Sequence, residues 1–203
     1  MMDILFAMVL GGVLLLVVIS ANSIIAESQA TTNGDVLVQE MLTSVAEIVE
    51  GEIRNMGFGA PENVPSVVLA DTSDIRFIID LDKDPITEVD TVEYFLGDTT
   101  ELRKTPNPHD RLLYRRVNGG AAEPKGAVTM FHLQYLTLGG DTISAPVPSG
   151  RLSEIDVVEL TLEVQNPQTL FRAQGSVQQG EEEALYSTSV WQQTRLASQN
   201  SRR

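Results

Sequence analysis

The chain opens on an apolar run, Ile4-Leu-Phe-Ala-Met-Val-Leu-Gly-Gly-Val-Leu-Leu-Leu-Val-Val-Ile19, that contains no charged residue. Ser20, Asn22 and Ser23 interrupt it before Ile24 and Ile25 close it. The whole stretch has about 22 residues, which make roughly 33 Å of helix and match the hydrocarbon core of a bilayer. We therefore predict a retained membrane helix.

Two other interpretations fit this run less well. A cleaved signal peptide has a basic start and a shorter apolar core, whereas this start has Asp3 and no Lys or Arg. A buried core helix is seldom apolar on every face. Gly11 and Gly12 permit close helix approach without forming a full GxxxG motif. The residues expected to carry membrane anchoring and assembly are Ile4, Leu5, Phe6, Val9, Leu10, Val13, Leu14, Leu16 and Val17.

Composition limits the remaining possibilities. The chain has 203 residues, with 28 acidic and 14 basic ones and a net charge of −14. Such a chain repels nucleic acid, and the acidic excess suggests a solvated exterior, a high-salt habitat or cation binding, of which a salt-adapted surface is the simplest interpretation. The absence of cysteine removes disulfides, thiolate metal sites and cysteine nucleophiles. Because only a few residues precede the apolar run, we expect residues from about Glu27 onward to lie outside the cytoplasm.

A second helical pattern follows the apolar run. The polar patch Ser28 to Asp35 is either a helix break or a softened part of one long helix, since Gly34 disfavours helix without forbidding it. Beyond it, apolar residues recur at steps of three and four and should pack on a sheet: Val38, Met41, Leu42, Val45, Ile48, Val49, Ile53 and Met56. The opposite face is assigned to Glu40, Glu47, Glu50 and Glu52. The segment Gly57-Phe-Gly-Ala-Pro61 should end the helix.

After Pro61 the apolar period changes to two, which predicts strands. They are expected at 67–69, 75–81, 89–96, 112–117, 128–138, 155–164 and 185–196, with turns at Asn118-Gly-Gly120 and Gly139-Gly-Asp141. The predicted class is α+β: a long N-terminal helix, membrane-embedded in its first half and amphipathic in its second, packed on an antiparallel sheet. The predicted division is a membrane helix at 1–26, its amphipathic continuation at 27–60, a β-rich head at 61–197 and a frayed tail at 198–203.

The order of these elements resembles that of type IV pilins and pseudopilins. The segment Glu52-Ile-Arg-Asn-Met-Gly-Phe-Gly59 is similar to the D-I-R-x-A-G-Y-G helix end of PilW-type minor pilins and of the J-type minor pseudopilins of type II secretion. Further similar segments follow in the same order: Asp80 to Asp84, Asp90 to Leu96, Leu113 to Arg116, Val128 to Tyr135 and Ile155 to Leu162. The resemblance implies a structural subunit that is held in the inner membrane and associates with itself or with similar subunits through its apolar helix.

The sequence departs from that family at its start. The family's leader ends in Gly and is followed by an aromatic residue or Met, with Glu at the fifth mature position. Here position five is Leu5 counted from Met1 and Phe6 counted from Met2, and Asp3 is the only acid at that end. The expectation is a membrane-anchored pilin-like protein, either already processed or not processed by a prepilin peptidase.

Candidate chemistry is sparse. Asp80, Asp82 and Asp84 place three carboxylates within five residues, a spacing that serves calcium, although Pro85 and Thr91 stand where a calcium loop has Gly and Glu. A solvated acidic turn is the simpler interpretation. His109 and His132 are too few for a zinc site, and no catalytic motif is present, so an enzyme is not expected. The pair Arg115-Arg116 is assigned to salt bridges, Trp191 to core or edge packing and 181–183 to a solvated loop.

Two functions remain open at this stage. The first is a structural subunit of a type IV-like filament, its tip or a secretion apparatus. The second is a membrane-tethered extracytoplasmic binding module or adhesin, which uses the acidic loops and is stabilised by Ca²⁺. Recovery in a filament distinguishes the two, and metal-dependent melting reports a calcium-loaded head in either case.

Overall fold

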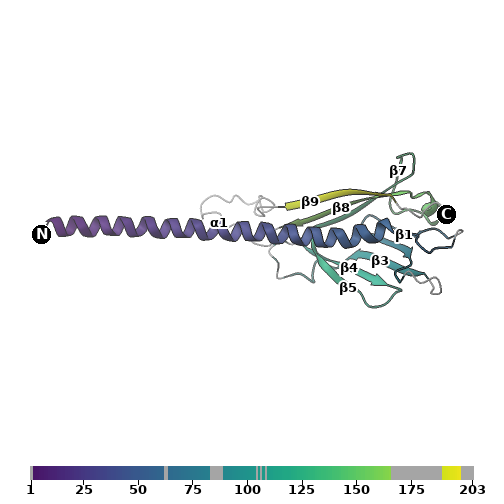
Figure 1. The fold of residues 1–203 in the computed structure, drawn as a ribbon, viewed down its shortest axis with the longest axis horizontal. Helices are drawn as coiled ribbons and strands as arrows, with labels where there is room; N and C mark the ends of the chain where they lie inside the picture. The colour runs from purple at the N-terminus through teal and green to yellow at the C-terminus, as the bar shows by residue number, and fades with distance from the viewer. Residues whose placement is uncertain are drawn as a thin grey trace.

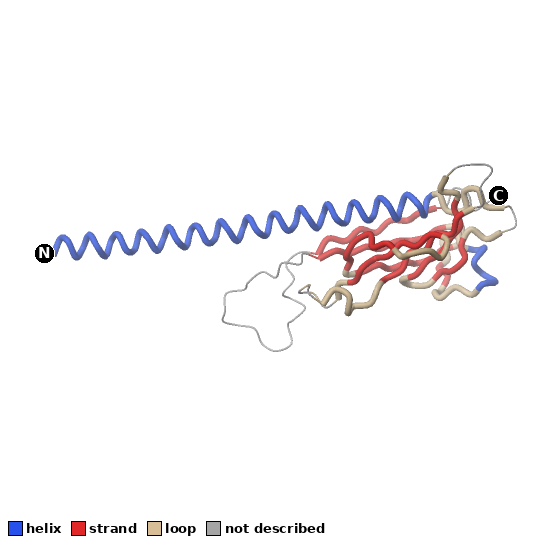
Figure 2. The backbone as a smooth tube through the Cα atoms, turned by 90° about the horizontal axis from the view of Figure 1, so that it is seen from below, coloured by secondary structure: helices blue, strands red, loops and turns tan. Residues whose placement is uncertain are grey.

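The structure is a computed structural model that describes residues 2–61, 64–82, 89–103, 105, 107, 109–165 and 189–197. Its dominant element is one helix, α1, which runs for 53 residues from Met2 to Arg54. At 1.5 Å per residue this helix is roughly 80 Å long. Its first half projects away from the strands, and its second half lies along them (Figures 1 and 2). The predicted α+β class is confirmed.

The polar patch between the two halves does not break the helix. Thr32 Oγ1 donates to the carbonyl of Ser28 at 2.9 Å, and Ser23 Oγ donates to the carbonyl of Ile19 at 3.1 Å. Hydroxyls bonded to the preceding turn fit within a helix. Of the two alternatives left open by the sequence, the continuous helix is therefore the one observed.

The predicted helix stop is confirmed. The last helical residue is Arg54, and Gly57 and Gly59 follow with φ angles of 80° and 76°. Such angles suit glycine, which has no Cβ to clash. The Gly57 amide donates to the carbonyl of Ile78 at 2.7 Å, so the turn is tied to a strand immediately after the helix.

Two antiparallel sheets make up the head. The first has five strands in the order β1-β2-β3-β4-β5, which are Val67–Ala70, Asp74–Ile79, Asp90–Leu96, Arg111–Val117 and Glu123–Val128. The second has the order β7-β6-β8-β9, which are Thr142–Ile143, Met130–Leu136, Val157–Gln165 and Ser189–Ala197. The 3₁₀ helix η1, Ser149–Glu154, precedes β8. The sheets are joined by the amide of Thr129, which donates to the carbonyl of Glu163 at 2.8 Å.

One hydrophobic core is shared by the helix and both sheets. The helix contributes Val38, Leu42, Val45, Ala46, Val49 and Ile53, all buried. Its second half contacts β8 and β9 of the second sheet and β5 of the first. The predicted stripe was wrong at Ile48, which is 38% exposed, and it omitted Ala46. A helix held between two sheets is buried over a wide arc, and at 100° per residue Ala46 falls inside that arc whereas Ile48 falls outside it.

The prediction missed the strands β5 and β7 and the helix η1. The strand β5 reads Glu-Pro-Lys-Gly-Ala-Val, and Pro and Gly weaken a strand prediction. It forms because it is an edge strand, where Pro124 need not donate to a second neighbour. The strand β9 was predicted from residue 185, and its described part begins at Ser189.

Candidate functional site: the apolar half-helix and its junction with the head

The exposed half of α1 is the first candidate functional surface. Its segment Phe6–Ala26 has 21 residues and a mean hydropathy of 2.4, none of it buried. Among the described residues it is the one helix long and apolar enough to cross a membrane. The predicted anchoring residues lie within it or just before it, and eight of the nine are more than half exposed: Ile4, Phe6, Val9, Leu10, Val13, Leu14, Leu16 and Val17. The side chain of Leu5 lies outside the described part.

This exposure is compatible with a membrane anchor. A helix of this length that is apolar on every side is not stable in water. It must therefore be covered by lipid or by other helices. A Cβ added at Gly11 or Gly12 would meet nothing within 4 Å. Both glycines therefore leave open positions where a neighbouring helix can approach closely.

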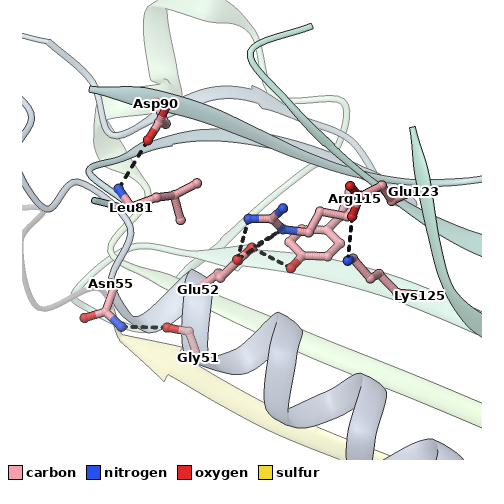
Figure 3. A network of polar contacts seen from close by, with 9 residues as sticks. Gly51, Glu52, Asn55, Leu81, Asp90, Arg115, Glu123 and Lys125 are labelled. Carbon is pink, nitrogen blue, oxygen red and sulfur yellow. Dashed lines mark hydrogen bonds and ion pairs between the residues drawn. The ribbon is translucent and has the colours of Figure 1, made fainter. Parts of the chain in front are cut away.

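A carboxylate of α1 fixes the helix to the first sheet. Glu52 accepts a hydrogen bond from the Tyr94 hydroxyl at 2.6 Å. It also accepts from Arg115 Nη2 at 2.7 Å and from Arg115 Nε at 3.0 Å (Figure 3). The two donors come from the neighbouring strands β3 and β4. The side chains of Arg115 and Glu52 are only 15% and 19% exposed, so this ion pair is largely shielded from solvent.

A second carboxylate fixes the helix to the other sheet. Glu50 accepts from Thr194 Oγ1 at 2.7 Å and from Gln192 Nε2 at 2.8 Å, both on β9. Two residues apart on one helix, Glu50 and Glu52 thus hold opposite sheets. We call these two carboxylates and their partners the helix clamp. The sequence assigned both to the face opposite the apolar stripe, and that prediction was wrong because each finds buried or partly buried donors that no periodicity reveals.

Protonation equilibria in the clamp favour the bonded state. Burial, followed by the charge of Glu52, raises the pKa of Tyr94 well above its usual range. The hydrogen bond to Glu52 raises the pKa of Arg115, an effect that burial opposes. Tyr94 and Arg115 therefore both keep their protons at neutral pH, and both remain donors to the same carboxylate.

The outer face of the first sheet carries a separate polar cluster. Glu93 is 5% exposed and accepts from Arg76 on β2 and from Arg116 on β4, the latter at 2.8 Å. The Arg116 guanidinium lies 4.6 Å from the ring centre of Phe95, which stacks on Tyr114 at 5.5 Å. The salt-bridge prediction for Arg115-Arg116 is confirmed, with the two side chains directed to opposite faces of the sheet.

The acidic turn gives no finished metal site. Asp84 lies outside the described residues, and among those that are described no group of three His, Asp or Glu side chains is placed to hold a metal ion. Asp80 borders a hollow of about 520 Å³ beside the end of the helix. Its other lining residues are Ile48, Gly51, Glu52, Asn55, Phe58, Ile79 and Leu81. Calcium binding through Asp80, Asp82 and Asp84 stays a prediction.

The remaining candidates lie on the surface. His132 is exposed on β6 and His109 is exposed in a loop, as the sequence indicated. Trp191 was expected in core or edge packing. It does lie on the edge strand β9, but its side chain is 64% exposed, so the packing part of that prediction was wrong. Odd-numbered residues of β9 point outward, because Gln192 and Thr194 face the helix.

Comparison by sequence and comparison by structure give different results. Neither a protein-family model nor a curated protein sequence matches this chain. A type IV-like pilin from Thermus thermophilus has a similar solved structure, with 14% sequence identity and a TM-score of 0.48. The similarity covers 81% of this chain and 97% of that one. At this level of identity it says nothing about individual residues.

Proposed function

We propose that this protein is a pilin-like structural subunit, anchored in the inner membrane with its head outside the cytoplasm. Phe6–Ala26 is the anchor, and in a filament, its tip or a secretion apparatus the same segment packs against the helices of neighbouring subunits. One observation carries the proposal. The first half of α1 is apolar and fully exposed, while the second half of the same helix packs into the core of the head. The family resemblance of the helix end supports it.

The helix clamp gives this proposal a mechanism. A subunit that assembles through its helix must pass force from the helix to the head without coming apart. Glu50 and Glu52 connect α1 to both sheets by charge-assisted or buried hydrogen bonds, which are the stronger kind. The head is therefore carried as one piece with the helix, as a structural role requires and a catalytic role does not.

The first test combines fractionation with mass analysis. Surface filaments sheared from cells are separated from membranes, and the native protein in each fraction is analysed by intact mass and N-terminal sequencing. Recovery in filaments supports a filament subunit, and a trimmed or methylated N-terminus adds the usual processing route. An unprocessed protein found only in membranes contradicts the filament role and favours the tethered binding module.

A matched pair of variants tests the helix itself. Leu14→Arg places a charge at the centre of the apolar segment, which costs about 2.5–3.5 kcal/mol in membrane insertion. Leu37→Arg makes the same change on the same helix beyond that segment, and the two leucines are 59% and 63% exposed. Loss of membrane and filament recovery with Leu14→Arg alone supports the proposal, and equal behaviour of the two contradicts it.

The calcium-stabilised binding module is kept as the second candidate because Asp80 borders the hollow at the helix end. Titration of the full chain with Ca²⁺ while melting is followed measures it directly. A melting temperature that rises with Ca²⁺ and not with Mg²⁺ supports the site, since a ligand that binds only the folded state stabilises it. If added Ca²⁺ leaves the melting temperature of both the parent and Asp82→Asn unchanged, the calcium site is contradicted.

A further inference from the structure

The outer face of the first sheet presents cations in a strongly acidic chain. Arg76 and Arg116 flank the buried Glu93, and their side chains are 38% and 34% exposed. Two guanidinium groups carry about ten N–H donors, and Glu93 accepts from only three of these nitrogens, which leaves donors on the solvent side. With Phe95 and Tyr114 beside them, they form what we call the guanidinium patch.

Two acidic side chains border this patch without filling it. Tyr114 donates to Glu101 at 2.8 Å, and that carboxylate lies in the loop after β3. Asp74 lies at the start of β2, beside Glu93 and Arg76. The patch thus combines partly exposed guanidinium groups with aromatic surface, a mixture that is enriched where proteins bind one another.

The complementary surface lies on the same chain. Glu40 and Glu47 are exposed on α1, and among the described residues neither makes an ion pair. At 100° per residue they lie opposite the buried stripe of Val38, Val45 and Val49, so they point directly away from the head. A shallow hollow runs along this face and is lined by Val36, Gln39, Glu40, Thr43, Ser44 and Glu47. We call it the acidic strip.

The two surfaces cannot meet within one molecule. The inner face of the first sheet is turned to α1 through Tyr94 and Arg115, so the patch on its outer face is turned away from the helix. The acidic strip is turned away from both sheets. A contact between them must join two copies, and because it joins different surfaces it continues from copy to copy and does not stop at a dimer.

We propose that the guanidinium patch of one copy binds the acidic strip of a second copy of this chain. The contact rests on the proposed function, because it supplies the head-to-head part of an assembly whose helix-to-helix part is the apolar segment. Complementarity of donors and acceptors selects the occupant: the patch presents the outer N–H groups of Arg76 and Arg116 beside two aromatic rings, and the strip offers two exposed carboxylates beside apolar Val36.

The contact fixes an axial offset between neighbours. Glu93 adjoins Tyr94, which is bonded to Glu52, so the patch lies near the level of residue 52 along α1. The acidic strip lies 5 to 12 residues earlier, at Glu47 and Glu40. At 1.5 Å per residue, the copy that contributes the strip is shifted outward by roughly 8–18 Å relative to the copy that contributes the patch. Helices of roughly 80 Å still overlap over most of their length after such a shift.

Because the chain has no cysteine, crosslinking tests the contact cleanly. The full-length variant Ser44→Cys/Thr91→Cys puts one thiol in the strip and one beside the patch and keeps every charge. In membranes or filaments, a short bismaleimide should link it into a ladder longer than a dimer. Each single variant should give no ladder. The pair Ser44→Cys/Thr142→Cys should also give none, because Thr142 lies on the far edge of the second sheet.

Charge reversal completes the test. Glu40→Lys/Glu47→Lys in the crosslinking background should reduce the ladder at least tenfold, and added salt should reduce it in the unreversed protein. The parent's own association is measured separately by sedimentation of the membrane-extracted protein. A parent that associates while the ladder is absent, or unchanged by charge reversal, overturns this contact and leaves the proposed function standing. A parent that does not associate overturns both.

Discussion

Removal of the Glu52 carboxylate should weaken the whole protein. In Glu52→Ala, Arg115 loses its partner while it remains 15% exposed, and the Tyr94 hydroxyl loses its acceptor. Breaking a buried pair costs about 3–5 kcal/mol, and because both groups retain some solvent contact we take the lower end. The lost hydroxyl bond adds about 1 kcal/mol. The expected loss is about 3–4 kcal/mol, a large part of the 5–15 kcal/mol that typically stabilises a domain.

The measurement is chemical denaturation of the full chain in detergent, followed by circular dichroism. Fluorescence is unsuitable because the single Trp191 is already exposed when the protein is folded. Glu47→Ala is the matched control on the same helix, and its change should stay within about 0.5 kcal/mol. Glu52→Gln keeps an acceptor without the charge and should fall between the two.

Two outcomes would refute this reasoning. One is a loss in Glu52→Ala no larger than that in Glu47→Ala. The other is a double-mutant cycle with Arg115→Ala in which the two changes simply add, since residues in one hydrogen-bonded pair should show a coupling of at least 0.5 kcal/mol.

Three further predictions concern backbone space and pH. Gly126→Ala should destabilise the protein by about 1–3 kcal/mol, because its Cβ would stand 2.7 Å from Val45 Cγ2. Gly51→Ala should stabilise the protein by about 0.5–1 kcal/mol, because it lies on a helix and its Cβ would meet nothing within 4 Å. If denaturation finds Gly126→Ala more stable than Gly51→Ala, the packing of α1 is contradicted. Burial and the nearby Glu93 raise the pKa of Asp74, so its ionisation should cost stability as pH rises from about 4 toward neutral. The free energy of unfolding of Asp74→Asn should therefore increase relative to that of the parent as the pH rises over that interval. A relative decrease would mean that the pKa of Asp74 is lowered in the folded protein.

Much of the fold was predictable because it follows from local rules. The apolar run, the three-and-four spacing up to Ile53 and the glycines after the helix each depend on neighbouring residues. Within β3, Val92 and Tyr94 lie on the face toward the core and Glu93 lies on the other, as the period of two requires. These patterns are fixed by the periods of helix and strand, which a sequence displays directly.

The site was harder to predict because its partners are distant in the chain. Glu52 meets a residue 63 positions away, and Glu50 meets one 144 positions away. Both glutamates look like solvent-face residues because a helical period assigns polar side chains to water. A helix held between two sheets has less free surface than that rule assumes, and a carboxylate near the edge of the buried arc can reach donors on either sheet. One signal was present: the sequence offers Tyr94 and Arg115 on the same strand faces as buried apolar residues.

The arrangement of α1 ties stability to assembly. Its second half supplies a third wall of the core, from Val38 to Ile53, so the head has no complete core without it. None of the segment Phe6–Ala26 in its first half is covered by the described residues. The two halves are one helix without a break, so lateral packing of the apolar half also orients the half that is clamped to the sheets. Any neighbour that fixes the apolar segment thereby fixes the direction of the acidic strip, since Glu40 and Glu47 are set by the same helical phase. Helix packing and head contact are then selected together, and a change at Gly11 or Gly12 that rotates the helix should also weaken the crosslinked ladder.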